Sequence, residues 1–204
     1  MSLTDFATVA GARQGQRVPT LERLQGGEEV RFLRGSSGPS YLRTDLDVCT
    51  DGSGPSHGDN WHQDETAGAY ADGTYLNADV TPYLVLPPQG YKALGTSHAR
   101  VGDLCVLRYQ DRWTPALLGE VGPKTKIGEA SYKALQELTG LAEVNPNTGK
   151  IPSGVECLVF PGSGRGQQWT LANTTPEALR PAAADLMRQQ LAAAEDTGGC
   201  WGLG

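Results

Sequence analysis

Basic residues are missing from a long stretch of this sequence. From Thr44 to Tyr91 there is no lysine and no arginine, while the same stretch has eight acidic residues: Asp45, Asp47, Asp51, Asp59, Asp64, Glu65, Asp72 and Asp79. The whole chain has 17 basic and 23 acidic residues and a net charge of −6. A nucleic-acid-binding protein needs a basic face, so we expect no nucleic-acid partner. The acidic stretch is either a solvated face or a surface that attracts a polycation or a metal ion.

Long apolar runs are also missing. No run approaches the roughly 18 residues that cross a membrane, so we expect no membrane association. Residues 1–15 do not have the charged segment followed by an apolar segment that marks a signal peptide. The four cysteines, at positions 49, 105, 157 and 200, have no CxxC spacing, so we expect no zinc site. Cys105 and Cys157 lie in apolar runs, where a buried thiol and a disulfide are equally compatible with the sequence.

Glycine and proline are abundant, with 27 and 13 residues in a chain of 204. This composition favours a turn-rich β protein with a single core over a helical bundle. Short apolar runs bounded by Gly, Pro, Asn or Asp predict strands over residues 29–34, 41–48, 81–88, 101–109, 113–121, 154–160 and 167–172. Two helices are predicted as well: one over residues 128–138 that ends at Gly140, and one over 175–195 with Pro176 at its first position.

One acidic pair has a spacing that suits catalysis. Glu120 ends an apolar strand and Glu129 follows nine residues later, after a turn rich in glycine and proline. Such a turn can bring two carboxylates to opposite sides of one cleft. Glycoside hydrolysis needs this arrangement, because one carboxylic acid protonates the leaving oxygen while a carboxylate activates water or attacks the sugar. Two glutamates at this spacing are also compatible with two ordinary surface acids.

Other motifs of the sequence match metal-binding and nucleotide-binding patterns poorly. The acidic run that begins at Asp45 has Cys49 where an EF-hand needs its third acid, so an EF-hand is excluded, although a looser cation site stays open. His57 and His62 have no third ligand beside them, so we expect solvated or hydrogen-bonded imidazoles. The glycines of residues 162–166 are not followed by a phosphate-binding Lys-Ser/Thr pair, which argues against a nucleotide site. We therefore expect no metal and no cofactor.

Five segments together resemble a known family. They are TDLDVCTDG, YLNADVTPYLVLPP, VGDLCVLRY, GEVGPKTKIGEAS and GVECLVFPGSG, and they follow the same order as the blocks of the glycoside hydrolase family 75 chitosanases, over roughly residues 42–164. The resemblance implies an endo-acting enzyme that hydrolyses β-1,4 links in deacetylated chitin with inversion. It also implies a mainly β fold, a six-stranded barrel of the double-psi type, with the internal helix at the active cleft and the C-terminal helix outside it.

The resemblance assigns the catalytic acids to Glu120 and Glu129. Glu129 matches the family's glutamate in GEAS, whereas Glu120 stands where the family usually has aspartate. The extra methylene moves the carboxylate by about an ångström, which costs about 100-fold in rate unless the scaffold adjusts. A helix N-terminus at Glu129 favours an ionised base there, and burial of Glu120 after the run PALLG favours a proton donor. The reverse assignment stays open.

The acidic stretch then has a physical reason, because chitosan carries an ammonium group on each deacetylated unit. We expect four aspartates to line the sugar subsites: Asp45, Asp47, Asp51 and Asp79. Trp61 and Tyr83 are candidates to stack on sugar faces, Trp61 because its neighbours are polar on both sides. The partner is thus a cationic amino-sugar polysaccharide, and the protein is expected to be a monomer.

The chain is expected to have three segments, and two alternative functions stay open. We expect an N-terminal extension over residues 1–27, a catalytic domain over 28–172, and a C-terminal helix and tail over 173–204. The resemblance implies action outside the cell. Two rivals stay open: a hydrolase of deacetylated peptidoglycan that serves as an antibacterial effector, and a catalytically inactive carbohydrate-binding protein in which Glu120 marks loss of the site.

Overall fold

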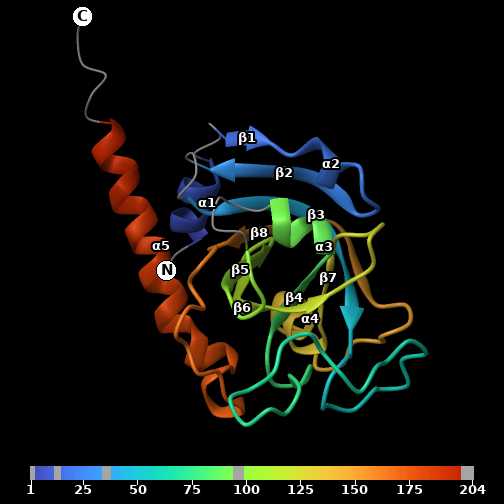
Figure 1. Ribbon diagram of the computed structural model, residues 1–204. Helices are drawn as coiled ribbons and strands as arrows, with labels where there is room; N and C mark the ends of the chain where they lie inside the picture. The colour runs from blue at the N-terminus through green and yellow to red at the C-terminus, as the bar shows by residue number, and fades with distance from the viewer. Residues whose placement is uncertain (1–2, 12–14, 34–37, 94–98, 199–204) are drawn as a thin grey trace, which may run out of the picture.

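The protein is a β-barrel with helices on its outside (Figure 1). The computed structural model describes residues 3–11, 15–33, 38–93 and 99–198. Its strands are β1 (Gly15–Arg17), β2 (Gly27–Leu33), β3 (Ser40–Cys49), β4 (Tyr83–Leu86), β5 (Leu104–Tyr109), β6 (Arg112–Val121), β7 (Glu129–Ser131) and β8 (Lys150–Val159). Its helices are α1 (Leu3–Gly11), α2 (Pro19–Glu22), α3 (Pro88–Ala93), α4 (Tyr132–Thr139), the 3-10 helix η2 (Leu171–Asn173) and α5 (Pro176–Gly198).

Six of the strands close into a barrel. The sheet order is β1-β2-β3-β7-β4-β6-β5-β8, and β8 also pairs with β3, so the sheet from β3 to β8 returns on itself. The pairs β3–β7 and β4–β6 are parallel, and the other pairs are antiparallel. The predicted mainly β fold with a six-stranded barrel is therefore confirmed. Strands β1 and β2 extend the sheet beyond β3 and are not part of the closed ring.

Apolar side chains fill two cores. The first lies within the barrel and under α4, and the second lies between the barrel, α1 and α5. In the second core, Phe6 of α1 and Met187 of α5 pack with Leu158 of β8. The C-terminal helix thus lies outside the barrel, as predicted. No described helix is both long and apolar enough to cross a membrane. The division of the chain at residues 27 and 172 stays a prediction.

Most predicted strands form, but residues 167–172 do not. Here the chain has no regular structure until η2, because its polar groups find other partners. The Trp169 indole N–H donates to the carbonyl of Gly102, and Thr170 caps η2 through a reciprocal pair of hydrogen bonds with Asn173. The strand prediction for this segment is wrong.

The internal helix begins later than predicted. Glu129 to Ser131 form β7, which pairs with β3 and β4, and α4 begins only at Tyr132. Ser131 is the N-cap, since its hydroxyl oxygen accepts the Ala134 N–H. The end at Gly140 is confirmed, because this residue takes the left-handed conformation with φ of 76°.

The cysteines that the structure describes are free thiols. Cys49, Cys105 and Cys157 are buried, and none of the three forms a disulfide. Burial raises the pKa of the Cys105 and Cys157 thiols, so both are neutral core residues. Of the two alternatives for this pair, the buried thiol is the one that forms. Cys200 lies outside the described residues.

Candidate active site

The sheet places Glu120 and Glu129 on either side of one residue. Val85 of β4 pairs with Glu120 of β6 on one side and with Glu129 of β7 on the other. Residues in register on neighbouring strands point to the same face, and the two Cα atoms are about 10 Å apart, which is twice the interstrand spacing. All three side chains line the same cleft, which has a volume of about 920 Å³.

Acidic residues dominate the lining of this cleft. Six carboxylates and two lysines line it: Asp47, Asp51, Asp59, Glu65, Glu120 and Glu129, with Lys126 and Lys150. One wall comes from the segment after β3, over residues 51–67, and the other includes residues 146–150 before and at the start of β8. Trp61 projects from the first wall with its side chain 84% exposed. The cleft therefore attracts a positively charged ligand and offers it an aromatic ring.

Two backbone N–H groups hold the carboxylate of Glu120. Oε2 accepts the Ala67 N–H at 2.7 Å, and Oε1 accepts the Val121 N–H at 2.6 Å. Burial raises the pKa of Glu120, the two N–H groups lower it, and the charge of Asp51 raises it again. The net pKa is raised, as the sequence predicted. The carboxylate nevertheless has a fixed orientation and donors that favour its ionised form.

Glu129 lies deeper and has a different environment. Burial raises its pKa, Lys126 lowers it, and the charges of Asp47 and Asp51 raise it. The Lys126 ammonium lies 3.9 Å from Oε1 of Glu129 but 2.5 Å from Oδ2 of Asp47, so most of its attraction goes to the aspartate. The predicted helix N-terminus is not at this residue. The expectation that a helix dipole keeps Glu129 ionised is therefore wrong, because its pKa is raised.

A sequence profile described as fungal chitosanase of glycosyl hydrolase group 75 matches residues 45–186, which is more than half of the chain. The chain belongs to this family. The protein is thus a chitosanase-type glycoside hydrolase, its substrate is a polysaccharide, and the resemblance seen in the sequence is confirmed. No match is found among curated proteins. The matched span includes both glutamates and the whole acidic cleft.

Of the other residues proposed from the sequence to bind the chitosanase substrate, three lie at the cleft. Asp47, Asp51 and Trp61 line it. Asp51 is half-buried, and its Oδ1 accepts the Gln63 N–H at 2.8 Å, which fixes the wall that carries Trp61. Burial raises the pKa of Asp51. These three positions stay candidates for sugar subsites of the chitosanase.

Asp45, Asp79 and Tyr83 lie elsewhere. A bulge in β3 between Thr44 and Leu46 turns Asp45 away from the cleft, and its carboxylate fills the space beside Gly26 and Gly128.

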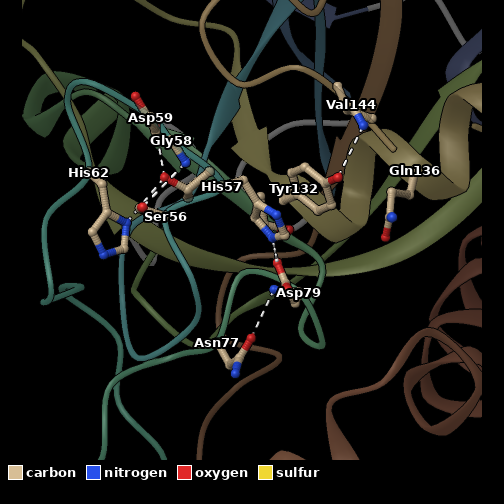
Figure 2. Close-up of polar contacts among 12 residues, drawn as sticks. Ser56, His57, Gly58, Asp59, His62, Asn77, Asp79, Tyr132, Gln136 and Val144 are labelled. Carbon is tan, nitrogen blue, oxygen red and sulfur yellow. Dashed lines mark hydrogen bonds and ion pairs between the residues drawn. The ribbon is translucent and has the colours of Figure 1, made fainter. Parts of the chain in front are cut away.

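Asp79 is hydrogen-bonded to His57, with 2.7 Å between Oδ1 and Nε2, in a second pocket (Figure 2). Tyr83 is fully buried, and its hydroxyl donates to the Asp51 carbonyl at 2.8 Å. A buried ring has no free face for a sugar, so Tyr83 supports the wall of the cleft and does not stack on the substrate.

Sequence reasoning missed Asp59, Glu65 and Lys126 as cleft residues. The first two belong to the acidic stretch, but the sequence does not rank its eight acids. Thr50 donates to Oδ2 of Asp59 at 2.8 Å, a contact that no spacing rule predicts. One sequence signal pointed to Lys126, since it stands three residues before Glu129 in the segment GEVGPKTKIGEAS.

The described residues hold no group of three or more His, Cys, Asp or Glu placed to bind a metal ion. The two histidines of the acidic stretch have other partners. Nδ1 of His62 lies 3.2 Å from the Thr50 hydroxyl, and His57 stacks on Tyr132 with ring centroids 4.0 Å apart. The hydrogen-bonded state expected for these imidazoles is confirmed.

Proposed function

We propose that the protein is an endo-acting chitosanase that hydrolyses β-1,4 links between glucosamine units, with Glu120 and Glu129 as its catalytic residues. The observation that carries the proposal is the pairing of both glutamates with Val85 across one acidic cleft. The cleft has an excess of carboxylates over lysines, which suits a polymer with an ammonium group on each unit. Asp47, Asp51 and Trp61 supply subsites along this cleft.

Inversion at the anomeric carbon fits the sheet geometry. Inverting enzymes hold their two carboxyl groups about 6.5–9.5 Å apart to leave room for a water molecule, and retaining enzymes hold them about 5–5.5 Å apart. Two strand spacings separate the Cα atoms of Glu120 and Glu129 by about 10 Å. This backbone spacing leaves room for the wider separation of the two carboxyl groups.

We assign the proton donor to Glu129 and the base to Glu120. Glu129 is the deeper of the two, and burial and its acidic neighbours Asp47 and Asp51 favour the protonated form. It gives its proton to the glycosidic oxygen as the bond to the anomeric carbon breaks. Glu120, held by two N–H donors, takes a proton from the water that attacks the opposite face of the sugar. Glu120 then releases this proton to solvent and Glu129 takes one up from solvent, which restores both groups.

Two finer points rest on the family. Endo action and action outside the cell are proposed from the family resemblance alone. Deacetylated peptidoglycan is the second candidate substrate, because it presents the same amino sugar and Glu120 departs from the family's usual aspartate. An inactive carbohydrate-binding protein is the third candidate, and the ordered hydrogen bonds of Glu120 count against a decayed site.

The test is release of reducing ends from soluble chitosan and from deacetylated peptidoglycan. The native protein is compared with Glu120→Gln, Glu129→Gln and the matched control Glu177→Gln, an exposed glutamate on α5. We expect turnover of chitosan that both cleft variants lose and the control keeps, with the α-anomer as first product by NMR. Turnover of peptidoglycan alone would replace the substrate. A folded native protein that binds chitosan without cleaving it would establish the binding protein instead.

A further inference from the structure

A second pocket lies beside the acidic cleft. It has a volume of about 840 Å³ and is lined by His57, Asp79, Tyr132, Gln136 and residues 142–146. Figure 2 shows the His57 ring between Tyr132 and Asp79, with Gln136 on α4 beside them. The mechanism proposed for Glu120 and Glu129 uses none of these side chains.

The two pockets lie between the same two segments of the chain. From the segment after β3, Asp59 lines the cleft and His57 lines the second pocket. From the segment before β8, Pro146 lines both. Between the two pockets, the side chain of Asn147 connects the two segments. Asn147 donates through Nδ2 to the Gly58 carbonyl at 2.8 Å and accepts the Asn60 N–H at 3.1 Å.

The second pocket has groups that fit an amino sugar. Asp79 is held in place, because its Oδ1 lies 2.7 Å from Nε2 of His57 and its backbone N–H donates to Asn77 at 2.9 Å. Glu143 is exposed at the pocket and adds a second carboxylate. Side-chain amides of Gln136 and Asn145 line it too, and amides both donate to and accept from sugar hydroxyls.

We propose that this second pocket is a distal subsite, in which the polysaccharide binds further glucosamine units after it passes Asn147. The proposal rests on the proposed function, because the units in the second pocket belong to the same polymer that Glu120 and Glu129 cleave. The carboxylates of Asp79 and Glu143 bind the ammonium groups of those units. Long substrates therefore bind through both pockets, and short ones bind through the cleft alone.

The test varies the length of the substrate. Glucosamine oligomers from trimer to octamer are compared on the native protein, on Glu143→Lys and on the charge-matched control Glu177→Lys. We expect Glu143→Lys to lower kcat/KM for the octamer by roughly fivefold, the size of one exposed ion pair, and to leave the trimer within about twofold. The control should follow the native protein at every length. An equal effect of Glu143→Lys on trimer and octamer, or no effect on either, overturns the proposal.

A binding measurement keeps the two proposals separate. Affinities for trimer and octamer are measured by calorimetry on Glu129→Gln, with and without Glu143→Lys. Weaker binding of the octamer alone in the double variant supports the distal subsite even if the native protein cleaves nothing, in which case only the proposed function fails. Equal octamer affinity with and without Glu143→Lys, or no binding of the octamer at all, overturns the distal subsite.

Discussion

The carboxylate of Glu120 accepts the backbone N–H of Ala67, with 2.7 Å between Oε2 and the nitrogen. Ala67 belongs to a turn that Thr66 holds. The buried hydroxyl of Thr66 donates to the Gly68 carbonyl at 2.7 Å and accepts the Leu76 N–H at 3.0 Å. This turn gives the side chain at position 120 a fixed orientation, and we expect it to be the scaffold adjustment that the extra methylene of Glu120 requires.

Replacement of Thr66 by valine should shift the acidic limb of the pH profile of kcat/KM. The variant keeps the shape of Thr66 but loses both hydrogen bonds of the hydroxyl, so the turn no longer holds the Ala67 N–H on Glu120. The pKa of Glu120 then rises further. Since a base must be ionised, the acidic limb of kcat/KM moves to higher pH, and Thr66→Ser restores it. If the alkaline limb moves instead, Glu120 is the proton donor.

Removal of the charge at Lys126 should shift the alkaline limb of the pH profile of kcat/KM. Lys126 lowers the pKa of Glu129, so Lys126→Met raises this pKa. A proton donor with a higher pKa stays protonated to higher pH, and the alkaline limb of kcat/KM therefore moves upward. Lys150→Met is the control, because Lys150 lines the same cleft but is not among the groups that shift Glu129. An alkaline limb that does not move would contradict the assignment of Glu129 as donor.

Glu129→Gln should make the protein more stable while it abolishes activity. Burial raises the folded-state pKa of Glu129 above its unfolded value, so the ionised form is the less stable one in the fold. Stability is therefore greatest below the unfolded pKa and falls as pH rises through the folded pKa. Glutamine removes this cost at neutral pH and matches the protonated glutamate in acid. Each 1 kcal/mol corresponds to about 2–4 °C in a chain of this size.

Thermal unfolding at pH 7 and at pH 4 measures this effect. We expect a higher Tm for Glu129→Gln than for the native protein at pH 7, and a smaller difference at pH 4. Glu177→Gln, exposed in the first turn of α5, should not raise Tm at either pH, because it removes only a favourable charge at the helix N-terminus. A lower Tm for Glu129→Gln at pH 7 would mean that its attraction to Lys126 outweighs the cost of burial.

The barrel was predictable because its strands have local signals. The runs over residues 101–109 and 113–121 become β5 and β6, each ended by a turn residue, and most of their apolar side chains are buried. β7 was not predictable from the sequence, since its three residues directly precede a helical pattern and pair with strands that are distant in the sequence. The pairing with β3 and β4 is a tertiary effect that overrides the local preference.

The two glutamates that we propose as catalytic come from the family motif, and both line the cleft, whereas only some of the predicted subsite residues do. Asp47 lines the cleft and Asp45 does not, although alternation along a strand would place them on one face. The bulge in β3 breaks that alternation, and no turn residue marks it in the sequence. Tyr83 lies among apolar residues in a buried strand, which was a sign of core packing.

Trp61→Ala should weaken substrate binding without loss of stability. The indole is 84% exposed at the cleft, so its removal leaves no cavity. The loop keeps its shape, because Asp59 accepts the backbone N–H of residue 61 at 2.9 Å and not a side-chain group. Loss of one stacked ring, worth about 0.5–1.5 kcal/mol, raises KM for chitosan by about two- to tenfold with little change in kcat.

Trp113 is the matched control for this variant. It packs against the second core, and the Arg180 guanidinium lies 4.3 Å from its ring centroid, away from the residues that line the cleft. Trp113→Ala should therefore lower Tm and leave KM for chitosan unchanged. Steady-state kinetics and thermal unfolding on both variants separate the two roles. A fall in Tm for Trp61→Ala with an unchanged KM would show that this indole supports the loop and does not touch the sugar.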